Sequence, residues 1–159
     1  MKKILIVDDE KDIRFILEEI LNEHKYHVIT LGTIKEAEEF INKNSFDIAL
    51  LDVLLDEKSR DGLYLLNLIK NKNKDLPVIM MSGHANIQIA VNSVKDGAFE
   101  FLEKPFNQER LLNFIKRGIE YSELVNTKKD LHDNFFKSFD FIGESKEIMK
   151  IKESINKVS

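Results

Sequence analysis

The chain has 159 residues, which is enough for one well-packed domain with an additional segment. Hydrophobic residues make up 43% and charged residues 33%, as is ordinary for a globular protein, and the absence of cysteine excludes disulfides, thiolate metal sites and thiol nucleophiles. The net charge of −4 comes without a dense basic patch, so we expect these residues not to bind nucleic acid on their own.

The N-terminus, MKKILIVDDE, contains an apolar run of four residues that ends at Asp8. A secretory signal needs a longer apolar region than this. No later stretch of the sequence approaches the length of a membrane span. We therefore expect a cytoplasmic protein with no membrane partner.

Short apolar runs alternate with longer amphipathic segments five times along the chain. The runs are rich in Ile, Val, Leu and Phe without clean alternation, which is typical of strands buried on both faces of a parallel sheet. They span residues 4–7, 27–31, 47–51, 77–81 and 99–102.

The segments between these runs place apolar residues at helical spacing. Their apolar stripes consist of Ile13, Ile16, Leu17, Ile20 and Leu21; of Ala37, Phe40 and Ile41; of Leu63, Leu66 and Ile69; and of Ile87, Ala90, Val91 and Val94. This alternation predicts an α/β domain with a doubly wound parallel sheet, whose working site lies at the carboxyl ends of the strands.

The segment after Pro105 has a different character. Residues 107–135 contain no proline and carry an apolar track past the expected edge of the domain, which predicts a fifth helix that runs on as a linker. In the tail, Ser145 is a capping candidate ahead of an apolar stripe of Ile148, Ile151 and Ile155. That stripe has nothing obvious to pack on, so we expect the chain to end inside a second domain.

Ionisable and polar side chains follow four of the predicted strands. Asp8 and Asp9 come after the first strand, Asp52 closes the third, Ser82 follows the fourth and Lys104 follows the fifth. Because parallel strands end at one edge of the sheet, we expect these side chains to converge there. Three carboxylates without a cation would repel one another, and Mg²⁺ is the hard divalent ion that prefers such oxygen ligands.

Each of these residues has an ordinary alternative when it is taken alone. An aspartate at a strand end is commonly a turn former or a helix cap, Ser82 could cap a helix near Ala85, and a single lysine is usually a solvated charge. Their joint placement at four strand ends favours a functional site.

The segments VDDE, ALLDV, MMSGHA and EKPF resemble the receiver domain of two-component response regulators, over roughly residues 1–122. Within that family, SGHANIQIAV and KDGAFEFLEKPF are similar to the NtrX/NtrC nitrogen-regulation type. The tail FIGESKEIMKIKESINKVS resembles the opening of the AAA+ domain of sigma-54-dependent activators, although the phosphate loop of that domain is absent.

This resemblance implies a five-stranded parallel sheet in the order 2-1-3-4-5 with a C-terminal linker helix. It divides the chain into a receiver domain at 1–122, a linker that extends the fifth helix at 123–140, and the start of a truncated AAA+ domain at 141–159.

The resemblance also implies roles for individual residues. Asp52 would be the phosphoryl acceptor, and Mg²⁺ (or Mn²⁺) would be held by Asp8, Asp9, Asp52 and the backbone carbonyl of Leu54. Ser82 and Lys104 would bind the phosphoryl oxygens, Phe101 would turn inward as a packing switch, and Pro105 would follow a cis peptide bond. Two departures from the family pattern are a phenylalanine in place of the more usual tyrosine at 101 and a longer loop that contains Asp56 and Glu57.

The partners implied are a sensor histidine kinase as the phosphoryl donor and a second copy of the chain. The second copy would bind through the face of the fourth helix, fifth strand and fifth helix and through the linker helix. DNA and sigma-54 RNA polymerase would be reached only through domains that this sequence lacks.

Two other functions compete with the phosphoacceptor hypothesis. An aspartate-based phosphatase of the haloacid-dehalogenase type needs a second acid two residues after the nucleophile, where this chain has Leu54. A receiver that is not phosphorylated and serves only as a dimerisation or docking module remains an open alternative.

Overall fold

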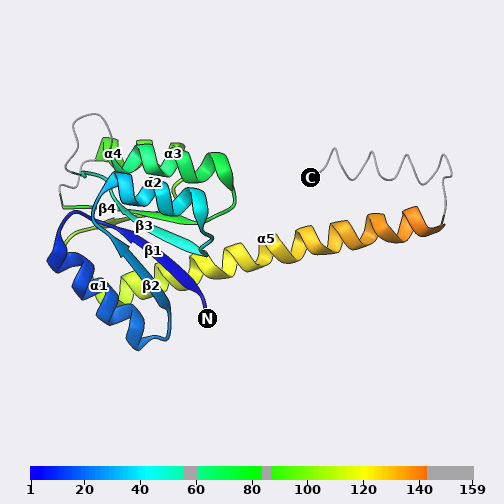
Figure 1. Ribbon diagram of the computed structural model, residues 1–159, viewed down its shortest axis with the longest axis horizontal. Helices are drawn as coiled ribbons and strands as arrows, with labels where there is room; N and C mark the ends of the chain where they lie inside the picture. The colour runs from blue at the N-terminus through cyan, green and yellow to red at the C-terminus, as the bar shows by residue number, and fades with distance from the viewer. Residues whose placement is uncertain (56–60, 84–86, 143–159) are drawn as a thin grey trace. The chain divides into compact units, whose positions relative to one another are not determined.

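The computed structural model describes residues 1–55, 61–83 and 87–142, which form five strands and five helices (Figure 1). The strands are β1 (Lys3–Val7), β2 (His27–Leu31), β3 (Ile48–Asp52), β4 (Val78–Ser82) and β5 (Glu100–Glu103). The helices are α1 (Lys11–Glu23), α2 (Ile34–Lys43), α3 (Gly62–Lys72), α4 (Ile87–Lys95) and α5 (Gln108–Ile142).

The strands form one parallel sheet in the order β2-β1-β3-β4-β5, which confirms the predicted fold class and strand order. From β1 the chain adds β2 on one side of β1, and it then adds β3, β4 and β5 in turn on the other side. The order therefore reverses between β1 and β3, and in doubly wound sheets ligands bind beside such a reversal, at the carboxyl ends of the strands.

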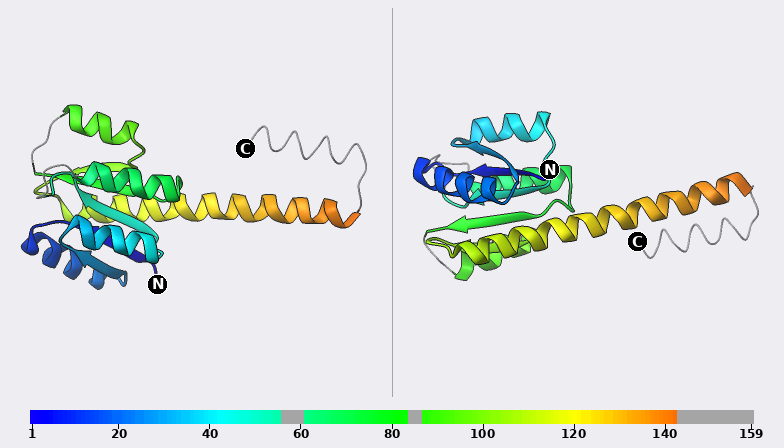
Figure 2. Two further views of the ribbon diagram at one scale, coloured as in Figure 1. Left: turned by 45° about the horizontal axis from the view of Figure 1, so that its top comes forward. Right: turned by 90° about the horizontal axis from the view of Figure 1, so that it is seen from below.

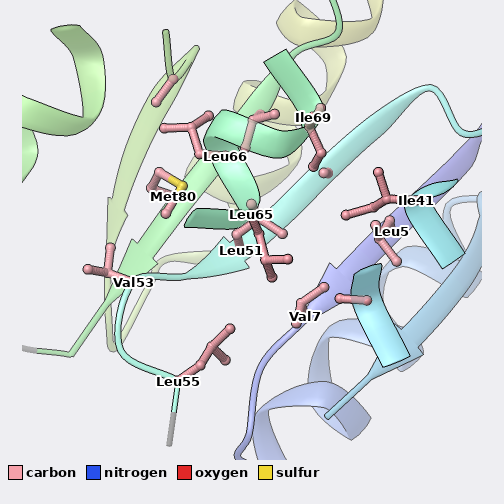
Figure 3. Packing of buried hydrophobic residues seen from close by; sticks show 14 of the residues in the cluster. Leu5, Val7, Ile41, Leu51, Val53, Leu55, Leu65, Leu66, Ile69 and Met80 are labelled. Carbon is pink, nitrogen blue, oxygen red and sulfur yellow. The ribbon is translucent and has the colours of Figure 1, made fainter. Parts of the chain in front are cut away.

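Alternate residues of the central strands enter two separate cores, because successive side chains in a strand point to opposite faces. Leu5, Val7 and Leu51 lie in the first core, among the buried residues of α2 and α3 (Figure 3). Ile4, Ile6 and Leu50 lie in the second core, with residues of α1 and α5. Figure 2 shows these helix layers from two further directions. The sequence pattern of continuous apolar runs thus reflects burial on both faces.

Side-chain hydrogen bonds cap α2 and α3 and link the two helices. Thr33 caps α2 by accepting from the Glu36 N–H at 3.2 Å, and Asp61 caps α3 by accepting from the Tyr64 N–H at 3.1 Å. The Tyr64 hydroxyl of α3 donates to Glu38 of α2, so a side-chain hydrogen bond also links the two helices.

The fourth apolar stripe is on a helix, as predicted, but it does not cover the sheet. In α4 the side chains of Ile87, Val91 and Val94 are 86%, 42% and 57% exposed. The helix instead turns Ser93 inward, where its hydroxyl donates to the Ile89 carbonyl at 2.8 Å, and Ile89 packs against the first core. A small residue allows α4 to approach the sheet closely.

Helix α5 is 35 residues long, and the chain divides into two compact units at Met1–Ser122 and Glu123–Ser159. In the first unit, Leu111, Phe114 and Ile115 of α5 pack in the second core. In the second unit, Leu124 and Leu131 are exposed. The predicted AAA+ segment at 141–159 lies almost wholly outside the described residues, and the proposed domain boundaries stay predictions. Within the described ranges, no helix has the length and apolarity needed to cross a bilayer.

Candidate functional site

The strand register brings Asp8 and Asp52 to the same level of the sheet. Val7 is paired with Leu51, and an aspartate follows each of these two residues in the sequence. The N–H of Asp8 donates to the Leu31 carbonyl at 3.1 Å, which extends the β1–β2 pairing by one step. Both aspartates are almost fully buried, at 0% and 4% exposure.

Four acidic side chains meet at this edge. Asp8, Asp9, Glu10 and Asp52 each place a carboxylate oxygen within 4.8 Å of the others. Asp9 and Glu10 are exposed while the other two are buried, so the cluster has an inner and a solvent-facing side. Glu10 was not among the predicted site residues, although it directly follows the aspartate pair in VDDE. It belongs to the cluster because it stands at the start of α1.

Among the described residues, Lys104 is the cation whose side chain pairs with these carboxylates. Its Nζ lies 2.6 Å from Asp8 Oδ2, 3.3 Å from Asp52 Oδ2 and 3.6 Å from Glu10 Oε1. The lysine follows β5, and its backbone N–H donates to the Ser82 carbonyl at 2.8 Å. The side chain is only 9% exposed, so these charges interact in a partly dehydrated setting, where electrostatic forces are stronger than in water.

The pKa of Asp52 is raised from 3.8 to about 6, first because the carboxyl is buried and then because Asp8 is a like charge beside it, with Lys104 opposing both effects. Burial by itself lowers the pKa of Lys104, but its hydrogen bond and attraction to Asp8 and its attraction to Asp52 outweigh this and raise the pKa overall. Lys104 therefore stays charged at neutral pH and only partly balances the carboxylates.

The donor set fits a hard divalent cation. Clustered carboxylate oxygens are what Mg²⁺ or Mn²⁺ prefers, and four carboxylates here face a single lysine among the described residues, so the cluster is short of positive charge. An ion here would lie beside a buried carboxylate that is itself able to act as a nucleophile.

A family model described as "Response regulator receiver domain" matches residues 4–116, which is most of the chain. The chain belongs to the response regulator receiver family. The nitrogen assimilation regulatory protein NtrX of Azorhizobium caulinodans is 35% identical over 98% of the chain and 34% of that protein. This chain spans about a third of the length of the curated relatives it matches.

Two solved receiver domains are also similar. The receiver domain of NtrX from Brucella abortus is 40% identical, with a TM-score of 0.69 over 74% of this chain and 98% of that one. The beryllofluoride-activated NtrC4 receiver domain dimer is 42% identical, with a TM-score of 0.72 over 77% of this chain and 99% of that one. The chain is therefore a receiver domain of the NtrX/NtrC type, as its motifs predicted.

The structure places the other predicted site residues of this receiver domain as follows. Ser82 ends β4 rather than following it, and it is buried. The N–H of Leu54 donates to Asp52 Oδ1 at 3.3 Å, and Phe101 is half-buried against the first core. The Lys104–Pro105 peptide bond is cis. Asp56 and Glu57 lie outside the described residues.

Gly62 is a further residue of the site that sequence reasoning missed. A Cβ at this position would lie 1.9 Å from the backbone carbonyl oxygen of Asp52, so only glycine allows the start of α3 to lie so close. The Gly62 N–H also donates to the Val53 carbonyl at 2.9 Å. The sequence shows a glycine directly after the capping Asp61, which is the one signal that could have identified it. Its close approach to the Asp52 carbonyl depends on tertiary structure and cannot be seen in the sequence.

Proposed function

We propose that this receiver domain accepts a phosphoryl group from a sensor histidine kinase onto Asp52, with Mg²⁺ (or Mn²⁺) held by Asp8, Asp9, Asp52 and the backbone carbonyl of Leu54. The observation that carries the proposal is the buried Asp52 carboxylate, which lies 3.3 Å from Lys104 Nζ and within an acidic cluster that is short of positive charge.

In the proposed transfer, an ionised Asp52 oxygen forms a bond to phosphorus while the bond from phosphorus to the kinase histidine nitrogen breaks. Phosphoryl transfer depends mainly on positioning and on neutralising the oxygens of the transferred group. The divalent ion supplies part of that charge when it is bound. Lys104 moves its Nζ from the carboxylates to a phosphoryl oxygen, and the Ser82 hydroxyl donates to another.

The switch is proposed to run from Ser82 through Phe101 to the surface of α4, β5 and α5. Phe101 lacks a hydroxyl, so its inward movement would be driven by packing alone. The surface already combines the exposed apolar residues of α4 with an ion pair between Arg117 and Glu100 at 3.4 Å. We propose that a second copy binds this surface, with the linker helix contributing, because the similar NtrC4 receiver domain is described as a dimer.

The output of the whole protein is proposed from the same relatives. The receiver would regulate transcription in the cytoplasm through an AAA+ domain that engages sigma-54 RNA polymerase and through a DNA-binding domain. The proposed division is a receiver at 1–122, a linker at 123–140 and the start of the AAA+ domain at 141–159.

The test is incubation of the chain with acetyl phosphate and Mg²⁺, followed by intact mass measurement. We expect one phosphoryl adduct on the wild type, no adduct with EDTA, and none on Asp52→Asn. Lys104→Ala should still be labelled, since the Asp52 carboxylate is still present as the nucleophile. The conformational switch that follows labelling should weaken in this variant. A wild-type chain that is never labelled would support the docking module instead, and continuous release of phosphate without an adduct would support a phosphatase.

A further inference from the structure

Arg14 of α1 contacts the backbone of the acidic segment rather than its carboxylates. Its Nη1 donates to the main-chain oxygen of Asp8 at 2.6 Å. The side chain is half-buried, and its guanidinium covers Gly32, where a Cβ would lie 2.8 Å from Nη1. This hydrogen bond links the first helix to the segment that carries the proposed metal ligands.

The remaining polar atoms of Asp8 also have partners. Its N–H donates to the Leu31 carbonyl at 3.1 Å, and its Oδ1 accepts from the Glu10 N–H at 2.8 Å. Its Oδ2 accepts from Lys104 Nζ at 2.6 Å. The contact with Arg14 therefore completes the hydrogen bonding of Asp8, and it is the contact that acts on the peptide unit between Asp8 and Asp9.

The orientation of that peptide unit decides where Asp9 points. The Asp8 carbonyl belongs to the rigid plane that joins Asp8 to Asp9, so fixing its oxygen fixes the direction in which the next residue starts. Asp9 is exposed and its carboxylate lies in the cluster, so the direction of its backbone contributes to the placement of that carboxylate. A charged donor such as a guanidinium makes a stronger hydrogen bond than a neutral one.

We propose that Arg14 is a positioning residue for the cation site: it fixes the Asp8–Asp9 peptide unit so that the Asp9 carboxylate faces the cluster. The inference rests on the proposed cation binding by this receiver domain. The positive charge of Arg14 by itself would weaken Mg²⁺ binding, because a cation beside an acidic site repels a second cation. The proposed positioning role has the opposite effect and strengthens Mg²⁺ binding. Removal of a bystander arginine would leave Mg²⁺ binding unchanged or tighter, whereas removal of a positioning arginine weakens it.

The experiment measures Mg²⁺ affinity by isothermal titration calorimetry on the whole 159-residue chain, together with the melting temperature in EDTA. Arg14→Met is expected to bind Mg²⁺ about tenfold more weakly, since loss of residues that orient metal ligands typically costs 10–100-fold in affinity. Arg14→Lys keeps the charge and one donor, so it should recover much of the loss. Lys11→Met removes an exposed cation from the same helix and should leave the affinity unchanged or slightly tighter.

The outcomes are distinct. If Arg14→Met binds Mg²⁺ as tightly as the wild type, or more tightly in parallel with Lys11→Met, Arg14 is a bystander and the inference is wrong. If Arg14→Met does not fold, Arg14→Gln decides the question in the same way, because it is equally neutral and too short to reach the Asp8 carbonyl. A wild-type chain that binds no Mg²⁺ contradicts the proposed function itself, which is a separate result.

Discussion

The acidic edge of the sheet and the surface of α4 are built in opposite ways. At the edge, Asp8 is buried and has a partner for its N–H, its carbonyl and both carboxylate oxygens. On α4, three large apolar side chains lie in solvent although their spacing is that of a core-facing stripe. The difference indicates that hydrogen bonds and ion pairs fix the acidic edge, while the exposed stripe of α4 contributes little to the core of the fold.

The largest stability effect should come from the backbone of the acidic edge. Gly62→Ala forces a Cβ against the Asp52 carbonyl, which cannot move without β3, so we expect about 2–3 kcal/mol of destabilisation. Urea unfolding measures it. Gly83→Ala is the matched control, since a Cβ there meets nothing within 4 Å, and it should change stability by less than about 0.5 kcal/mol. Equal effects of the two substitutions would show that α3 does not constrain Asp52.

A smaller change in stability, in the stabilising direction, is expected when the acidic edge loses a negative charge. The pKa of Asp52 is about 6 in the folded chain against an ordinary 3.8, so between these values the folded chain holds a proton that the unfolded chain has lost. Stability without metal should therefore fall as the pH rises through this window. Asp52→Asn should stabilise the chain in EDTA by about 1–2 kcal/mol at pH 7 and by almost nothing at pH 4.

The control for that measurement is Glu19→Gln, which neutralises an exposed acid of α1. Its effect on stability, measured in the same pH window, shows how much of the change follows from the removal of any one negative charge. Saturating Mg²⁺ should reverse the order of stability, because the wild type gains binding energy that the asparagine variant lacks. Destabilisation by Asp52→Asn in EDTA at pH 7 would contradict the charge imbalance inferred for the edge.

The smallest effect should come from the exposed stripe of α4. Val94→Ala is expected to change the free energy of unfolding by less than about 0.5 kcal/mol, because the side chain is mostly in solvent. Ile89→Ala on the same helix should cost about 1–2 kcal/mol, since that residue packs against the first core. Thermal or urea unfolding of the two variants measures both changes. A larger loss of stability from Val94→Ala than from Ile89→Ala would mean that the exposed stripe supports the fold.

The sequence alone predicted the fold and the family because both depend on patterns that are local in the chain. Continuous apolar runs mark doubly buried strands, and VDDE and EKPF lie where the strands end. The acidic pair, Asp52 and Lys104 do meet at one edge, since parallel strands bring their ends together. Their roles in phosphoryl transfer stay predictions.

The features that were missed depend on distances between segments. Periodicity shows that α4 is amphipathic, but it does not show that Ser93 rather than Val94 faces the sheet. Gly62 and Arg14 matter through contacts with backbone carbonyls of other elements, and a carbonyl carries no sequence signal. Glu10 joins the cluster through the position of the α1 start.

The hydrogen bond from Gly62 to Val53 has a consequence for how this family can vary. It ties together the two ends of the connection between β3 and α3, at 2.9 Å, immediately after Asp52. Residues can be added between these ends at little entropic expense, since the cost of closing a loop grows slowly with its length. The hydrogen bond therefore allows the length of this connection to change while the end of β3 and the start of α3 stay together.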